Sequence, residues 1–162
     1  MLTTVTGTRG AGTSNTVASP VFDKSADYWA RLTLPYERPP DALWGNTRTH
    51  WRQRHLHTRM VRTDVANLAR HAHLHRLDRP VRHVSVVWQW APGDNRRRDA
   101  DNGYPMLKAI CDGLARGRRD LIGIDLVPDD VPKWMTKHTP ILVPPPAKGM
   151  WVDISIWFEE AS

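Results

Sequence analysis

The sequence predicts a single α+β domain, a two-layer arrangement in which two main helices pack on a mixed β-sheet behind a disordered N-terminal tail. Segments that alternate between apolar and polar residues occur near both ends and in the middle of the chain, and two other segments carry apolar residues at helical spacing. The 162 residues suffice for one hydrophobic core but not for two. We therefore assign residues 1–26 to the tail and residues 27–162 to the domain.

The predicted tail is rich in Thr, Ser, Gly and Ala and has few large apolar side chains. A segment of this composition buries too little apolar surface to offset the entropy that it loses on ordering. The sequence therefore predicts no fixed structure for residues 1–26.

Four segments alternate with the period of a strand. Residues 28–34 form the first and are stopped by Pro35; residues 81–90 form the second, and residues 141–143 and 151–158 form the last two. The second strand places four large apolar side chains on one face: Val84, Val86, Trp88 and Trp90. The two tryptophans are expected to lie in the core or at a dimer interface.

Two segments have the 3.6-residue period of a helix. The first, residues 58–74, has a basic exposed side, and it follows a loop over residues 34–54 that is rich in proline and turn residues. The second begins after Asn102 as its cap and ends near Gly117. The chain from residue 118 to 135 shows no regular period.

Positive charge is concentrated in one part of the chain. Eight arginines and two aspartates lie between Trp44 and Arg79, so this segment has a net charge of +6, as has the whole chain. An excess of basic residues gathered in one segment is typical of a phosphate-binding face. We therefore expect a polyanionic partner.

The cysteine count and the hydropathy pattern bear on the compartment. Cys111 is the only cysteine, so no disulfide can form within the chain, and no apolar run approaches the ~20 residues of a membrane span. The first 27 residues lack both the basic start and the apolar core of a signal peptide. These features predict an intracellular, cytoplasmic protein.

Residues 95–104, "NRRRDADNGY", place three arginines beside two carboxylates, Asp99 and Asp101. If the chain is still extended after the strand, residues i and i+2 point to the same side. Two adjacent carboxylates are ligands that Mg²⁺ accepts, and the arginines would hold a phosphodiester next to the ion. The D-x-D spacing alone is more typical of a solvated loop with capping aspartates and local ion pairs.

Four blocks in this order, "LTLP" with the following "PP" and "HWRQR", then "RRRDADN", "LKAICDGL" and "VPDD", resemble the RusA family of Holliday-junction resolvases, especially its phage and prophage members. The resemblance covers residues 31–158. It implies a homodimeric, Mg²⁺-dependent endodeoxyribonuclease of DNA recombination and repair, with Mn²⁺ as an alternative ion. Such enzymes nick two opposed strands of a four-way junction, in the bacterial host cytoplasm where the protein is phage-encoded.

Matching positions in the motifs implies roles for individual residues. Asp99 and Asp101 match the first two metal-binding carboxylates, and Asp130 in "VPDDVP" matches the third. Lys108 matches the lysine that steadies the scissile phosphate. Asn102 matches the motif asparagine, but from the residues alone it is a helix cap, and we expect a structural rather than a catalytic role for it.

Two departures from the family pattern keep alternatives open. Lys108 lies six residues after Asn102, whereas some family members have three, and the connection between the second helix and the "DD" pair is longer than usual. Asp120, Asp125 and Asp129 therefore compete with Asp130 for the role of third carboxylate.

Basic residues in and around the first helix are expected to contact DNA phosphates, as are the arginines before the two aspartates. They are Arg48, His50, Arg52, Arg54, Arg59, Arg62, Arg96, Arg97 and Arg98. Trp44 and Trp51 flank the loop arginines and are candidates for stacking on an exposed base, although Trp51 could equally anchor the loop in the core. The same residues also suit a nuclease that acts on flaps or forks, or a non-catalytic module that binds branched DNA.

Overall fold

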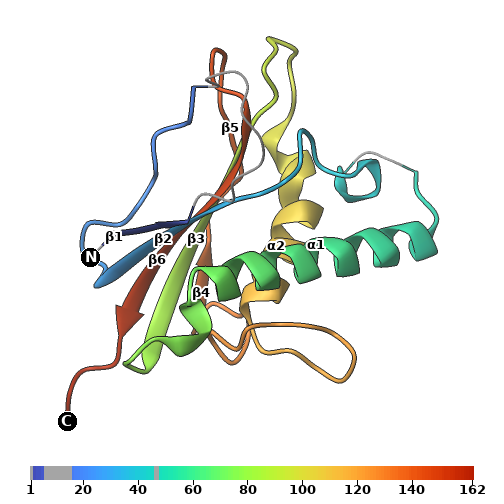
Figure 1. Cartoon of the computed structure of the whole chain (residues 1–162). Coiled ribbons are helices and arrows are strands. Elements are labelled where there is room, and N and C mark those ends of the chain that lie inside the picture. The colour runs from blue at the N-terminus through green and yellow to red at the C-terminus, as the bar shows by residue number, and fades with distance from the viewer. Residues whose placement is uncertain (1, 6–15, 46–47) are drawn as a thin grey trace.

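The computed structural model describes residues 2–5, 16–45 and 48–162, and for residues 2–5 it describes the backbone alone. Within these residues the predicted α+β class is confirmed. A mixed sheet carries two main helices, α1 (Trp51–His71) and α2 (Tyr104–Leu114), on one face (Figure 1). The predicted disorder of residues 6–15 lies outside the described residues. None of the described helices combines the length and the apolar character needed to cross a membrane.

The sheet has the strand order β1-β2-β6-β3-β4, and β5 pairs with the same edge of β3 as β4 does. In the centre of the sheet, β6 pairs antiparallel with both β2 and β3. At the edges, β1 pairs parallel with β2, and both β4 and β5 pair parallel with β3. Their bounds are β1 Leu2–Val5, β2 Tyr28–Thr33, β3 Val81–Ala91, β4 Met135–Lys137, β5 Ile141–Leu142 and β6 Gly149–Phe158. The four predicted strands are therefore present. The sequence pattern did not reveal the short β4, and it also missed β1, because residues 2–5 pair with β2 although they were assigned to the disordered tail.

The alternation of β3 and β6 creates two different faces. On the helix side, Val84, Val86, Trp88 and Trp90 of β3 meet alternate residues of β6 in the main core. The prediction that these four side chains share one face is confirmed, and their place is the core. The other face carries polar side chains, among them Gln89 and Asp153, which are nevertheless buried.

The helix α1 spans Trp51–His71, so it begins seven residues earlier than the predicted residue 58. Its first turns project beyond the sheet (Figure 1), and residues 51–56 are exposed. The apolar period starts only where the helix reaches the core, at Val61, so the exposed turns gave no periodic signal. The ring of His50 caps the helix by accepting a hydrogen bond from the backbone N–H of Arg52.

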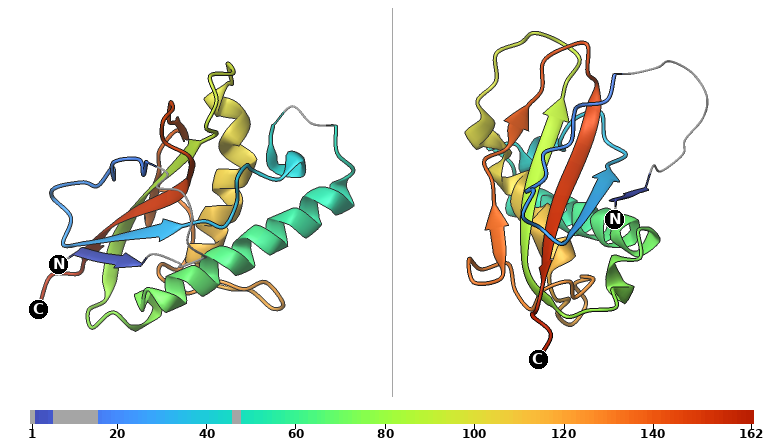
Figure 2. Two further views of the ribbon diagram at one scale, coloured as in Figure 1. Left: turned by 45° about the horizontal axis from the view of Figure 1, so that its top comes forward. Right: turned by 90° about the vertical axis from the view of Figure 1, so that its left-hand side faces the viewer.

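Residues 16–26 correct the prediction of a tail that is disordered as far as residue 26. They cross the sheet on the face opposite the helices (Figures 1 and 2). Side chains of the sheet bind their backbone: Asp153 Oδ2 accepts from Val21 N at 3.0 Å, Ser155 Oγ accepts from Asp23 N at 2.9 Å, and Gln89 Nε2 donates to Ser19 O at 3.0 Å. A segment bound through its backbone needs few apolar side chains of its own, which is why its composition was misleading.

The covered face contains a buried ion pair between Arg31 of β2 and Asp153 of β6. Arg31 Nε lies 2.8 Å from Asp153 Oδ1, in contact but not aligned as a hydrogen bond, and the Asp153 side chain has no exposed surface. Burial lowers the pKa of Arg31 and raises the pKa of Asp153, against the mutual attraction of the pair. The pair therefore depends on its neighbours, and either charge left alone in this place is unfavourable.

Replacing Arg31 by Met should lower the free energy of unfolding by about 3 kcal/mol, because it leaves the Asp153 carboxylate buried without its counter-charge. Urea unfolding followed by circular dichroism measures the change. The control is Arg59→Met, which removes an exposed pair with Asp120 and should cost less than about 1 kcal/mol. Equal losses in the two variants would contradict this view of the buried pair.

Candidate functional site

The motif turn that follows β3 has a different geometry from the expected one. Asp99 is extended, but the chain enters a 3-10 helix, Ala100–Gly103, directly after it. Asp99 caps this helix, since its Oδ1 accepts a hydrogen bond from Asp101 N at 3.0 Å. Contrary to the prediction, the chain is therefore not extended through both carboxylates, although both residues are exposed at the same turn.

The second helix, α2, spans Tyr104–Leu114 and begins in this turn. Its cap position is Gly103 rather than the predicted Asn102, and Pro105 lies in its first turn, where its missing N–H has no helical partner to lose. It ends three residues before Gly117, the predicted end. The helix buries an apolar face against the core and leaves Lys108 on the exposed side.

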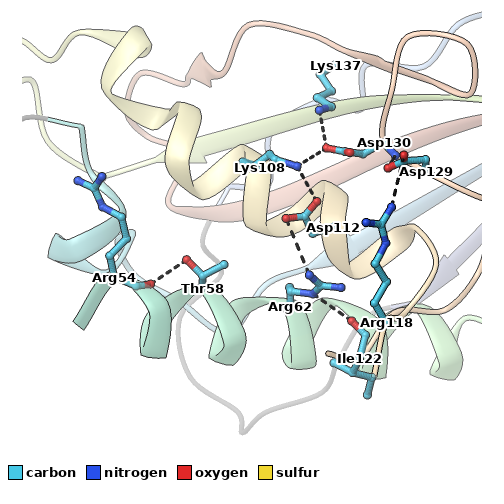
Figure 3. A network of polar contacts seen from close by, with 10 residues as sticks. All are labelled: Arg54, Thr58, Arg62, Lys108, Asp112, Arg118, Ile122, Asp129, Asp130 and Lys137. Carbon is cyan, nitrogen blue, oxygen red and sulfur yellow. Dashed lines mark hydrogen bonds and ion pairs between the residues drawn. The ribbon is translucent and has the colours of Figure 1, made fainter. Parts of the chain in front are cut away.

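Lys108 and Asp130, which are 22 positions apart in the sequence, are in contact (Figure 3). Lys108 Nζ lies 2.6 Å from Asp130 Oδ2 and 2.8 Å from Asp112 Oδ1, one helical turn further along α2. Lys137 of β4 approaches the same Asp130 oxygen, also at 2.6 Å. We call these four residues, Lys108, Asp112, Asp130 and Lys137, the lysine–aspartate cluster.

The contacts within the cluster favour the charged forms of Asp130 and Lys108. Burial raises the pKa of Asp130, but the hydrogen bonds from Lys108 and Lys137 and their charges outweigh it, so the pKa of this carboxyl lies well below its usual range. For Lys108, burial acts in the opposite direction and lowers the pKa, but the hydrogen bonds to Asp112 and Asp130 and the charges of these two carboxylates raise the pKa overall. The Lys108 side chain is still 55% exposed, so a charged ammonium group remains accessible from solvent.

The three predicted metal ligands do not form a metal site as they are arranged here. Among the residues that the structure describes, no group of three or more His, Cys, Asp or Glu side chains is placed to hold a metal ion. Asp99 and Asp101 belong to the turn before α2, whereas Asp130 is held by two ammonium groups. The carboxylates are of the right chemical kind, but the arrangement does not fit an ion shared by all three.

The competing third carboxylates point elsewhere. Asp129 accepts from Asp130 N at 2.8 Å and lies 3.6 Å from Arg118 (Figure 3). Asp125 accepts from Gly117 N at 3.1 Å, and Asp120 lies 3.5 Å from Arg59. Of the four candidates, Asp130 is the one in contact with Lys108. Its predicted role as the third metal-binding carboxylate stays a prediction.

The expected DNA-binding residues differ in their exposure. Seven of them are exposed: Arg48, His50, Arg52, Arg54, Arg59, Arg96 and Arg97. Arg52 and Arg54 lie on the projecting end of α1 rather than in a loop, which corrects their predicted setting. This end of the helix presents basic side chains on a protruding element.

Arg62 does not belong to that exposed set. It is 9% exposed, donates from Nε to Ile122 O at 3.1 Å, and lies 4.0 Å from Asp112 (Figure 3). It therefore joins α1, α2 and the connection after α2, and its role in the structure is to hold these segments together. The helical period could not reveal this, because the connection that covers Arg62 has no regular pattern.

Arg98 is also engaged within the protein. Its guanidinium lies 5.1 Å over the ring of Trp90, and it binds both carboxylate oxygens of Asp94 at 2.6 and 3.0 Å. The two tryptophans that were candidates for base stacking differ in their surroundings. Trp44 packs edge-on against Trp90, with the ring centroids 5.2 Å apart, whereas Trp51 is 67% exposed. Trp51 is therefore not a core anchor.

Sequence reasoning missed two members of the cluster. Asp112 stands four residues after Lys108 on the same helix, a spacing that puts the two side chains together, so this contact could have been found. Lys137 lies on the three-residue strand β4, which has no detectable period.

No protein-family model and no curated protein matches this chain.

Replacing Asp130 by Asn should lower the free energy of unfolding by about 1–3 kcal/mol, because two ammonium groups then lose the charge that they share. Thermal and urea unfolding measure the change. Asp129→Asn is the matched control; its carboxylate faces one exposed arginine, so it should cost less than about 1 kcal/mol. A larger loss for Asp129→Asn than for Asp130→Asn would contradict the assignment of Asp130 to the cluster.

Proposed function

We propose that this chain is a structure-specific endodeoxyribonuclease that resolves four-way DNA junctions by paired nicks, as the resemblance to the RusA family implies. The observation that carries the proposal is the contact between Lys108 and Asp130. Both residues belong to motifs far apart in the sequence, and a contact between them is expected if they serve one site. The accessible ammonium of Lys108 is the chemical group that such a site presents to a phosphate.

The role of the lysines follows from their charge and position. Asp112 and Asp130 hold Lys108 from two sides, which fixes its ammonium group before any ligand arrives. A fixed positive charge stabilises the negative charge that develops on phosphoryl oxygens during cleavage, and it does so without reorganisation. Lys137 adds a second ammonium at the same carboxylate and would act in the same way.

The exposed arginines of α1 would hold the DNA backbone. Arg52 and Arg54 lie on the projecting first turns of the helix and Arg59 lies further along it, and such side chains contact phosphates independently of sequence. Their contribution is to affinity and to its salt dependence. Arg96 and Arg97 would extend the same contacts to the turn that carries Asp99 and Asp101.

Two further features of the proposal come from the resemblance. A homodimer would bring two sites to opposite arms of a junction, because the two-fold symmetry of the protein then matches that of the DNA. Mg²⁺, or Mn²⁺ in its place, would supply Lewis-acid activation of a water molecule. Because the described carboxylates do not gather into a metal-binding group, we derive no step through the ion.

The second candidate function is non-catalytic binding of branched DNA. The absence of a three-ligand metal group among the described residues favours it. A nuclease for flaps or forks is the third alternative. Incubation with a synthetic four-way junction, a fork and a linear duplex, each with and without Mg²⁺, separates the three functions.

For the nuclease we expect nicks on the junction, and only with Mg²⁺. Cutting of the fork but not of the junction would contradict the resolvase and support a fork nuclease. Retarded but uncut DNA under all conditions would replace it by the binding module.

Replacing Lys108 by Met should slow nicking by about 100-fold, because a preorganised positive charge at the phosphate is lost. Asp101→Asn should abolish nicking, because the resemblance makes Asp101 a metal ligand, and it should leave junction binding intact or tighter, since one negative charge facing the phosphates is removed. The rate of nicking and the affinity for the junction are measured in parallel. The matched controls Lys133→Met and Asp78→Asn, both outside the proposed site, should cleave normally, and normal cleavage by the two test variants would contradict the site.

The salt dependence of junction binding tests the arginine face of α1. Arg54→Gln and Arg59→Gln should each reduce the slope of log K against log salt by about 1, as expected for the loss of one phosphate contact. Fluorescence anisotropy over a series of salt concentrations gives the slope. Arg82→Gln, an exposed arginine on β3, should leave the slope unchanged; equal effects of all three variants would mean that the face has been placed wrongly.

A further inference from the structure

A pocket of about 380 Å³ lies beside the turn that carries Asp99 and Asp101. Its walls come from the segment before α1, the end of β3 and the loop that leads to Asp99. The volume is within the range of small-ligand pockets. Another cavity, of about 650 Å³, lies at the far end of α1 and has no tryptophan, tyrosine or phenylalanine among its lining residues.

The pocket has planar walls that are held in place. Trp44 packs edge-on against Trp90, and Trp90 Nε1 donates to Glu37 O at 3.0 Å, which fastens the segment before α1 to β3. The guanidinium of Arg98 lies over the Trp90 ring, and Asp94 fixes it by two hydrogen bonds. An indole and a guanidinium plane, both prepositioned, form the kind of surface on which nucleobases stack.

The charges around the pocket are mixed. Four cationic side chains line it, Arg38, Arg96, Arg98 and Lys148, together with three carboxylates, Glu37, Asp41 and Asp94. A site for a simple anion would not combine so many carboxylates with its cations. A nucleotide fits better, because its phosphates need cations, while the amino groups of its bases donate to carboxylates.

The pocket is fastened to the proposed site. Gly45, next to Trp44, donates its backbone N–H to Asn102 O at 2.7 Å, and a Cβ at Gly45 would lie 3.1 Å from the Asn102 Cα. Asn102 directly follows Asp101, and Arg98 directly precedes Asp99. A base held in the pocket would therefore lie next to the turn that carries Asp99 and Asp101.

We propose that this pocket receives one unpaired nucleobase of the bound DNA, stacked against Trp44 and Arg98, with a neighbouring phosphate on Arg96 or Lys148. The inference rests on the proposed function, in which the DNA is branched and its bases at the branch point are free to leave the stack. It gives a physical reason for selecting branched over linear DNA, since a linear duplex would have to break a base pair to fill the pocket. It also makes the pocket the place where a base preference at the cut arises.

The experiment compares junctions that carry a normal base or an abasic site at each branch-point position, bound by the full chain and followed by anisotropy. An abasic site keeps the phosphate and removes the stacking group. For one position we expect at least about fivefold weaker binding without the base, since stacking of one base is worth about 1–3 kcal/mol. This measurement uses the unaltered protein, so it does not depend on the folding of any variant.

Variants then assign that loss to the pocket. In Arg98→Met, and in Trp44→Leu as a second variant, the difference between normal and abasic junctions should disappear, whereas Arg82→Met should retain it. Disappearance in Trp51→Ala instead would place the stacked base on the exposed tryptophan and overturn the proposal. A loss that persists in all these variants would overturn it too.

The outcomes separate this inference from the proposed function. Junction binding without any abasic loss would overturn the pocket and leave the function standing. An abasic loss that Arg98→Met removes, in a protein that never nicks, would support the pocket and replace the nuclease by the binding module. A chain that binds no form of DNA would overturn both.

Discussion

The contact of Lys108 and Lys137 with one oxygen of Asp130 is the constraint on which the site depends. It joins α2, the connection after α2 and β4, three segments that are otherwise separate in the sequence. Two ammonium groups at one carboxylate are favourable only while that carboxylate is charged, and they keep its pKa low. Asp112 and the buried Arg62 extend the contacts to α1, so the arginine-bearing helix and the lysines are positioned by the same set of ion pairs.

The two faces of the sheet serve different purposes. The helix face builds the apolar core, which fixes α1 and α2 and thereby the surface that carries the basic side chains. The opposite face uses buried polar groups, above all Arg31 and Asp153, to bind the backbone of residues 16–26. Buried charges of this kind contribute little net stability, but they make the covering segment specific, since each lost partner leaves a polar group unsatisfied.

Much of this fold could be predicted from periodicity: the main strands, the face of β3 and both helices have clear patterns in the sequence. The start of α1 could not be predicted, because residues 51–56 are exposed and have no apolar period. The ordered structure of residues 16–26 could not be predicted either, because their backbone is bound by side chains that are distant in the sequence. In the site, motif positions led correctly to Lys108 and Asp130 as neighbours. Lys137 and the buried place of Arg62 depend on segments without regular period, and the cap at Asp99 depends on a turn that the local pattern predicts to be extended.

The central claim is that the lysine–aspartate cluster faces the DNA backbone. Crystals of the chain with a four-way junction would test it most directly, through the distance between Lys108 Nζ and the nearest phosphate oxygen. The account predicts a hydrogen-bond distance of about 2.7–3.0 Å there, with the exposed arginines of α1 along the same strand. A junction bound to another surface, with the cluster open to solvent, would contradict it.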